Sequence, residues 1–250
     1  MLDLHQFAYN SDNYGVLLND PESGATACID AGDADEVLAA LTQKGWTLSE
    51  IWITHHHWDH TDGLAKLKEI TGAKVFGPAG VTGVDQVLSG GDTFSFAGNE
   101  VQVIHTPGHT LDMLNFYIAT ASMVFTGDTL FVMGCGRLFE GSADQMWQGM
   151  QKLMALPEDT MIYCAHEYTL ANAAFALSVD PENEDLINRS ELVKMQRDQG
   201  LATVPSRLDI ELASNPFLRP NDAGIRITLG LSDASDLDVF TEIRRRKDNF

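Results

Sequence analysis

The chain has 250 residues, of which 44% are hydrophobic and 21% are charged, and this composition excludes a disordered or fibrous protein. Asp and Glu number 36 against 16 Lys and Arg, so the formal net charge is −20. Such a chain repels nucleic-acid phosphates and anionic membranes, which disfavours both as partners. The charge is uneven, because residues 244–247 form a compact basic run near the end of an acidic sequence.

Short apolar runs alternate with Gly- and Asp-rich turns over the first two thirds of the chain. The runs predict strands, and the helical spacing of apolar residues predicts helices over residues 33–44, 62–70 and 143–156. Gly45 is the expected end of the first helix, and Asp62 is the expected cap of the second. Interleaved strands and helices are typical of the α/β or mixed α+β class. The predicted strands are residues 16–18, 25–29, 51–54, 74–77, 93–96, 100–105, 114–118, 123–125 and 160–164.

The pattern changes after His166. Residues 168–179, 181–199 and 236–247 have helical patterns, and strand signals are few. Pro181 suits the first turn of its helix, since proline is favoured there. We therefore predict an α/β domain followed by an α-helical one. The predicted domains are residues 1–166 and residues 167–250.

The segment THHHWDH holds an HxHxDH pattern. Alternate residues of extended backbone point the same way, so His55 and His57 can share one metal. Asp59 and His60 lie beyond the bend, where the chain enters a helix, and can serve a second metal nearby. His56 has the opposite parity and is expected to point away. Imidazole and carboxylate ligands together suit Zn²⁺, Fe or Mn²⁺.

Three more ligand-type residues each follow a predicted strand, namely His109, Asp128 and His166. Ligand sites in sheet proteins gather at strand ends. Seven ligands for two metals, with one carboxylate shared, leave room for a water between the ions. This is the arrangement of a two-metal hydrolase.

The segments THHHWDH, TPGHT, GDTLF and AHEYT resemble the metallo-β-lactamase-fold hydrolases. Within that superfamily the chain resembles glyoxalase II, the hydroxyacylglutathione hydrolase family, and CGRLFEGSADQM, NPFLR and RRRKDNF extend the resemblance over nearly the whole chain. The resemblance implies an αββα sandwich over residues 1–166, followed by a helical C-terminal domain that covers the site. The ligands it implies are His55, His57 and His109 for one metal, Asp59, His60 and His166 for the other, and Asp128 as the bridge.

The same resemblance implies a glutathione site. Arg137 matches the basic residue of the family's CG-[KR] segment, and Tyr168 follows the last metal-binding His and a Glu. Arg244 and Lys247 match a C-terminal RxxKD. Phe139 departs from the family, which commonly has Tyr there, and the lost hydroxyl contact would weaken binding by about 0.5–1.5 kcal/mol.

The activity implied is hydrolysis of S-(2-hydroxyacyl)glutathione, such as S-D-lactoylglutathione, to glutathione and a 2-hydroxy acid, in methylglyoxal detoxification. Two metals lower the pKa of bound water, and the resulting hydroxide attacks the thioester carbonyl. Asp59 is expected to orient this nucleophile and Asp128 to bridge the metals, so both are candidate catalytic residues. We expect two divalent ions per subunit, with zinc first and iron or manganese as alternatives.

Three other functions stay open on the sequence. A lactonase or another hydrolase of the same fold would share the metal ligands but not the RxxKD tail. A glutathione persulfide dioxygenase of this fold would use one iron, with fewer of the seven positions coordinating it. A non-catalytic metal-binding or scaffold domain is disfavoured by the intact ligand set.

The three cysteines, Cys28, Cys135 and Cys164, form no CxxC pair, so no disulfide framework is expected. The first residues show no basic segment followed by an apolar one, which argues against a signal peptide. No apolar run approaches the ~18 residues of a membrane span. We therefore expect a cytoplasmic monomer whose partner is a small-molecule substrate.

Overall fold

The computed structural model describes residues 1–250, which divide into two compact units. The first unit comprises Met1–His105 and Asp112–Gly127, and the second comprises Thr106–Leu111 and Asp128–Phe250. The chain therefore leaves the first unit at residue 106, returns to it at residue 112 and leaves it again at residue 128. The boundary at residue 167 stays a prediction of the sequence.

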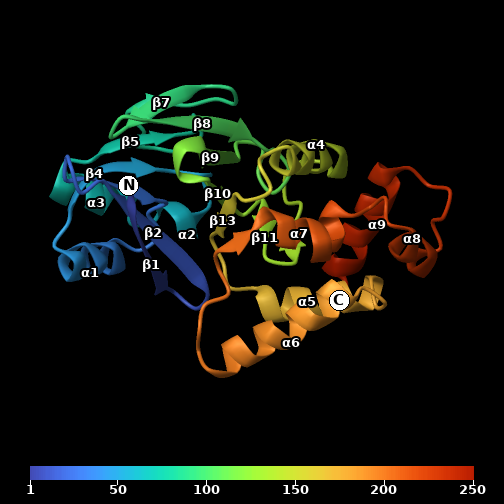
Figure 1. The fold of residues 1–250 in the computed structure, drawn as a ribbon. Helices are drawn as coiled ribbons and strands as arrows, with labels where there is room; N and C mark the ends of the chain where they lie inside the picture. The colour runs from blue at the N-terminus through green and yellow to red at the C-terminus, as the bar shows by residue number, and fades with distance from the viewer. The chain divides into compact units, whose positions relative to one another are not determined.

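A six-stranded sheet forms the first layer of the first unit, in the order β1-β2-β3-β4-β5-β6 (Figure 1). The pairs β1–β2 and β2–β3 are antiparallel, whereas β3, β4, β5 and β6 run parallel. β1 was not predicted, because its alternating polar residues leave it half-exposed at the sheet edge. The strands are β1 (Asp3–Tyr9), β2 (Asn13–Asn19), β3 (Ala25–Ile29), β4 (Thr47–Trp52), β5 (Lys74–Gly77) and β6 (Gln86–Val87).

Three helices belong to the same unit: α1 (Ala34–Lys44), α2 (Trp58–Thr61) and α3 (Leu64–Thr71). Gly45 ends α1 in the left-handed conformation, with φ 69°, as predicted. The prediction that Asp62 caps α3 is wrong, since Asp62 closes α2 and Gly63 precedes α3. Gly63 packs too closely for a side chain, because a Cβ there would lie 2.4 Å from the Ala34 nitrogen.

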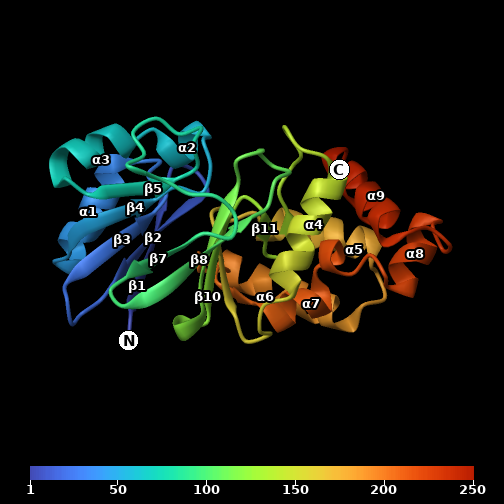
Figure 2. The ribbon, with the colours of Figure 1, turned by 90° about the horizontal axis from the view of Figure 1, so that it is seen from above.

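The second sheet of this unit is an antiparallel meander in the order β10-β9-β8-β7. Ala97 and Gly98 form its first turn with φ values of 48° and 77°, as a two-residue hairpin requires. Figure 2 shows α1 and α3 on one side of the first sheet and β7 and β8 on the other. The strands are β7 (Thr93–Phe96), β8 (Asn99–His105), β9 (Leu114–Ile118) and β10 (Met123–Gly127), with a short helix η1 (Ala119–Ala121) before β10.

Trp52 joins the two sheets into a sandwich. Its fully buried indole meets four phenylalanine rings of the second sheet at centroid distances of 5.1–6.5 Å. Aromatic pairs of this geometry add to the burial of their large apolar surfaces. The predicted α/β sandwich is therefore confirmed. The four rings belong to Phe94, Phe96, Phe116 and Phe125.

The second unit is mainly helical, as predicted for the C-terminal part. Its core contains the aromatic rings of Trp147, Phe175, Phe217 and Phe240. None of the helices is long and apolar enough to cross a bilayer. The elements are β11 (Leu130–Phe131), β12 (Gly134–Cys135), α4 (Ala143–Met154), β13 (Met161–Cys164), α5 (Thr169–Val179), α6 (Glu184–Asp198), β14 (Ser206–Arg207), α7 (Leu208–Ser214), η2 (Pro216–Leu218), α8 (Ala223–Leu229) and α9 (Asp236–Asp248).

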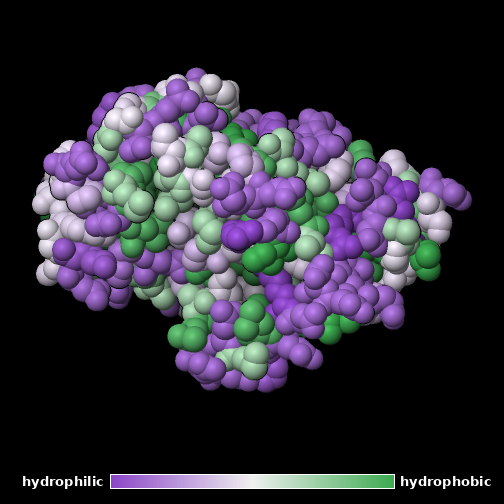
Figure 3. Space-filling model, viewed as in Figure 1, coloured by the Kyte–Doolittle hydropathy of each residue, from purple (hydrophilic) through white to green (hydrophobic).

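The helix predicted to begin near Pro181 begins later. Asn183 caps α6 by accepting the backbone N–H of Leu186 at 3.1 Å, so Pro181 lies before the helix. Asp180 closes α5 through its own N–H instead. The short helices α7 and α8 were not predicted, because seven residues are too few to show a helical period. The face of the molecule in Figure 3 is mainly hydrophilic, in keeping with the acidic composition.

Candidate metal centre

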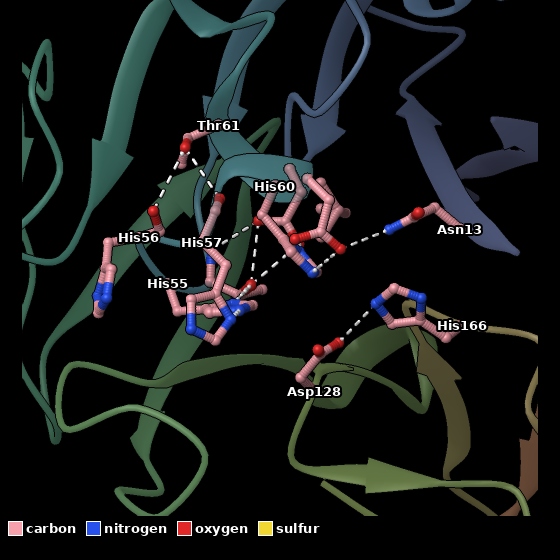
Figure 4. A network of polar contacts seen from close by, with 12 residues as sticks. Asn13, His55, His56, His57, His60, Thr61, Asp128 and His166 are labelled. Carbon is pink, nitrogen blue, oxygen red and sulfur yellow. Dashed lines mark hydrogen bonds and ion pairs between the residues drawn. The ribbon is translucent and has the colours of Figure 1, made fainter. Parts of the chain in front are cut away.

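The extended segment after β4 brings His55 and His57 together. His55 Nε2 lies 3.0 Å from His57 Nδ1 (Figure 4), and the His55 ring centroid is 4.1 Å from that of His60. Two imidazole nitrogens on one tetrahedral zinc would stand about 3.3 Å apart. The alternation of side chains along extended backbone therefore produces the pairing that the sequence predicted. His56 turns away and contacts the Asp112 carboxylate at 3.0 Å.

Asp30, at the end of β3, fixes the orientation of His60. Its Oδ2 lies 2.7 Å from His60 Nδ1, and its Oδ1 accepts the backbone N–H of Thr54 at 2.8 Å. The Thr54 hydroxyl also bonds Asp30 and lies 2.9 Å from His55 Nδ1. Because the Nδ1 atoms of both histidines are occupied, Nε2 is the atom each would present to a metal.

Asp59, in the first turn of α2, is held by three parts of the first unit. Asn13 donates to its Oδ2 at 3.0 Å, and the Tyr9 hydroxyl donates to its backbone oxygen at 2.9 Å. Gly32 passes so close that a Cβ there would lie 1.8 Å from that same backbone oxygen. The position of the carboxylate is therefore set by residues from β1, β2 and the loop after β3.

The second unit carries the other three predicted ligands, all nearly fully buried. Asp128 Oδ2 lies 3.2 Å from His109 Nε2, and Asp128 Oδ1 lies 3.2 Å from His166 Nε2 (Figure 4). One carboxylate thus turns a separate oxygen to each of two imidazoles, which is the geometry that a bridging ligand needs. His109 Nδ1 contacts the Arg137 carbonyl at 2.9 Å, and that bond leaves its Nε2 as the ligand atom.

The donor set fits divalent metals of the zinc, iron and manganese type. His55, His57, Asp59 and His60 belong to the first unit, and His109, Asp128 and His166 belong to the second. Two His and Asp clusters formed from these seven residues are consistent with a dinuclear metal site. Imidazole and carboxylate do not select one of the three metals.

Three of the five predicted glutathione residues are partly or largely exposed in the second unit. The Tyr168 ring stacks on His166 with centroids 4.7 Å apart and an interplanar angle of 5°. The Phe139 ring lies 5.2 Å from that of His109. Arg137 is 56% exposed and reaches Asp248 at 3.3 Å. Each side chain thus combines solvent exposure with a contact to a candidate ligand or to α9.

The two predicted glutathione residues on α9 are more enclosed. Arg244 is only 4% exposed and donates from Nη1 to the carbonyls of Cys135 and Gly136 at 2.8 and 3.2 Å. Lys247 donates to the Ala171 carbonyl at 2.9 Å. Burial, and next to it the charge of Arg244, lowers the pKa of the Lys247 ammonium to about 8.

Comparisons with known proteins cover the whole chain. The hydroxyacylglutathione hydrolase C-terminus family matches residues 167–250, and the metallo-beta-lactamase superfamily matches residues 18–83 and 77–166. Hydroxyacylglutathione hydrolases from Brucella ovis and Brucella canis are 51% identical over 253 residues. The match covers 100% of this chain and 98% and 97% of those proteins. The chain belongs to the hydroxyacylglutathione hydrolase (glyoxalase II) family.

Solved structures show the same fold for this hydroxyacylglutathione hydrolase. ETHE1 from Myxococcus xanthus has a TM-score of 0.71 at 24% identity, with 97% of this chain and 90% of that chain covered. BLEG-1, a B3 metallo-beta-lactamase, has a TM-score of 0.67 at 19% identity, with 87% and 100% covered. Both similarities concern the fold alone.

The residues that orient the ligands of this hydroxyacylglutathione hydrolase could not be predicted from its sequence. Asp30 and Asn13 lie in no recognisable motif, and Thr54 begins THHHWDH but is not a ligand-type residue, although Asp30 and Thr54 each follow an apolar strand run. The cysteines are buried, and burial raises the pKa of the Cys135 thiol to about 11 and that of Cys164 to about 12. Both therefore stay protonated near neutral pH and are poor nucleophiles.

Proposed function

We propose that this enzyme hydrolyses S-(2-hydroxyacyl)glutathione thioesters, such as S-D-lactoylglutathione, to glutathione and a 2-hydroxy acid. This reaction is a step of methylglyoxal detoxification. The observation that carries the proposal is the 51% identity to hydroxyacylglutathione hydrolases over the full length of both chains. The His and Asp clusters, in which all residues except His57 and Asp59 are buried, offer the ligand types that a metal-dependent hydrolase needs.

We assign the ligands of two metal ions as follows. His55, His57 and His109 hold one ion, Asp59, His60 and His166 hold the other, and Asp128 bridges them. The 3.0 Å separation of the His55 and His57 nitrogens supports the first assignment. The division of the two Asp128 oxygens between His109 and His166 supports the bridge. Zinc is the expected metal, with iron and manganese as alternatives.

Two divalent ions held by these residues would lower the pKa of a bound water and polarise the thioester carbonyl. The Asp59 carboxylate, with one oxygen held by Asn13, orients the attacking water. The acceptors Asp30 and the Arg137 carbonyl keep the protons of His60 and His109 on Nδ1, so that each Nε2 keeps its lone pair. The departing glutathione thiolate is a good leaving group, so the reaction needs no strong general acid.

Cationic and aromatic residues of the second unit bind the glutathione part of the substrate. Arg137, Arg244 and Lys247 bring positive charge to a protein of net charge −20, and glutathione carries free carboxylates. Tyr168, stacked on His166, offers its hydroxyl beside a metal ligand. Phe139 offers no hydroxyl, so one hydrogen bond common in the family is absent here.

The test is the release of free thiol from S-D-lactoylglutathione by the purified protein. Activity should vanish on chelation and return when zinc, iron or manganese is added. Metal analysis of protein purified without added metal should find two ions per chain. Absence of thiol release, together with oxygen uptake in the presence of glutathione persulfide, would instead assign a persulfide dioxygenase. Turnover of lactones without thioesters would assign a lactonase.

A further inference from the structure

The hairpin β11–β12 has its turn deep inside the second unit. Val132 and Met133 form the turn, and they are 2% and 0% exposed. Turns normally lie at the surface, because buried backbone polar groups need partners. Met133 also has a φ of 53°, a left-handed conformation that is uncommon for a residue with a long side chain. A buried turn of this kind persists only when surrounding groups hold it.

Side chains from the helical region form hydrogen bonds with the backbone polar groups of this turn. Glu211 on α7 accepts the backbone N–H of Met133 at 2.9 Å. Asn215, at the end of α7, donates to the carbonyls of Phe131 and Gly134 at 3.2 and 3.1 Å. Asn172 on α5 donates to the Val132 carbonyl at 3.1 Å. The four polar groups thus bound are Phe131 O, Val132 O, Met133 N and Gly134 O.

The three side chains form one buried set, which we call the turn clamp: Asn172, Glu211 and Asn215. Glu211 is completely buried, and its other oxygen forms an ion pair with Arg189. Asn215 is also completely buried and donates to Glu211 Oε2 at 3.0 Å. Gly134 lies so close to Asn172 that a Cβ there would stand 2.5 Å from the Asn172 amide nitrogen. The clamp therefore fits the turn without spare volume.

The open end of the same hairpin carries the candidate metal ligands. Asp128 stands two residues before β11, and Gly136 continues β12 by donating to the Thr129 carbonyl at 3.0 Å. The next residue, Arg137, accepts the Nδ1–H of His109 with its carbonyl. One arm of the hairpin thus leads to the bridging carboxylate, and the other leads to the group that orients His109.

We propose that the turn clamp is a positioning element for the metal centre. By fixing the depth and register of the hairpin, Asn172, Glu211 and Asn215 set the places of Asp128 and of the Arg137 carbonyl. The C-terminal helical region then shapes metal binding as well as substrate binding. This inference rests on the proposed metal centre.

The test variant is Asn172→Leu, which removes the donor to Val132 while keeping the number and branching of the side-chain heavy atoms and favouring the helix. Residues that orient metal ligands typically contribute 10–100-fold to metal affinity. We therefore expect zinc to bind about 10-fold or more weakly in a chelator competition. Glu211→Gln should act in the same direction, and it serves as the second variant where the first does not fold.

Asn183→Ala is the matched control. Asn183 caps α6 and donates to the Ala213 carbonyl at 3.0 Å, so its loss weakens the same helical region without touching the hairpin. Metal-free Asn183→Ala should lose stability comparably to Asn172→Leu yet bind zinc as the wild type does. Equal zinc affinity in Asn172→Leu, Asn183→Ala and the wild type would overturn the inference.

A measurement on the wild type keeps the test independent of variant folding. Coupling between two sites is reciprocal. Zinc should therefore slow hydrogen exchange at the Met133 amide, whose N–H donates to Glu211. The effect should be smaller at the Leu186 amide, whose N–H donates to Asn183. Equal exchange with and without zinc at Met133 would count against the clamp. Failure of the wild type to bind zinc at all would instead overturn the proposed metal centre.

Discussion

Replacing Asp30 by Asn tests the orientation of the metal ligands with the least change of shape. The carboxylate accepts hydrogen bonds from three donors: the Thr54 N–H, the Thr54 hydroxyl and the His60 Nδ1–H. An amide has only one oxygen, so its NH₂ group must face either His60 or the Thr54 N–H. Both orientations are unfavourable, for different reasons.

An Asn NH₂ that faces His60 would donate to Nδ1 and move the imidazole proton to Nε2. The nitrogen that should bind the metal would then be protonated. Loss of such an orienting partner typically lowers metal affinity 10–100-fold, or about 1.4–2.8 kcal/mol. An NH₂ that faces Thr54 leaves a buried N–H without its acceptor, which costs about 1–3 kcal/mol of folding free energy.

The assay is zinc affinity by chelator competition, together with the unfolding free energy of the metal-free protein. Asp30→Asn should lower at least one of these by the amounts given, and kcat at limiting zinc should fall more than KM rises. Asp33→Asn is the matched control, because it also replaces an Asp by Asn and the side chains are equivalent as helix caps. Unchanged zinc affinity and unchanged stability in Asp30→Asn would refute the orienting role of Asp30.

Three further predictions concern the ligands and the substrate site. His55→Ala should abolish thiol release, whereas His56→Ala, one residue away and turned towards Asp112, should retain most of it; equal loss in both would contradict the parity argument. Phe139→Tyr should lower KM for lactoylglutathione by about 2–13-fold, the equivalent of one hydrogen bond of 0.5–1.5 kcal/mol, and an unchanged KM would show that the hydroxyl has no partner. Because the pKa of Lys247 is lowered to about 8, its positive charge is present below that pH and lost above it, so KM should rise above pH 8. In Lys247→Gln, KM should be higher than in the wild type at every pH and should no longer increase above pH 8. If KM of this variant still increases above pH 8, the increase belongs to another group.

The parts of the metal site that sequence reasoning predicted are those set by local backbone geometry. His55 and His57 share one side of an extended segment, and Asp59 and His60 follow in the first turn of a helix. The local backbone of one short stretch, residues 55–60, therefore fixes the relative positions of all four ligands. Asp30 could not be found this way, because it contacts His60 only through a bond across 30 positions of sequence. A single Asp after a strand carries no signal of that contact.

The end of the chain shows a different limit. A basic run at the end of a helix predicts side chains exposed to solvent, because cations are favoured at helix C-termini. Arg245 follows that expectation and pairs with Glu242, at 65% side-chain exposure. Its neighbour Arg244 is buried against the Cys135 and Gly136 carbonyls. The difference in burial between Arg244 and Arg245 depends on the packing of α9 against β12. The composition of the basic run does not predict that packing.

Two glycines determine how far this site can vary. A Cβ at Gly32 would lie 1.8 Å from the Asp59 backbone oxygen, and a Cβ at Gly136 would lie 2.0 Å from that of Asp128. The backbone of each candidate catalytic aspartate is thus approached by a residue that has no side chain. Even Ala, the smallest replacement, would push the aspartate aside. A saturation mutagenesis screen should therefore find these two positions as intolerant as the aspartates themselves, although neither glycine has any reactive group.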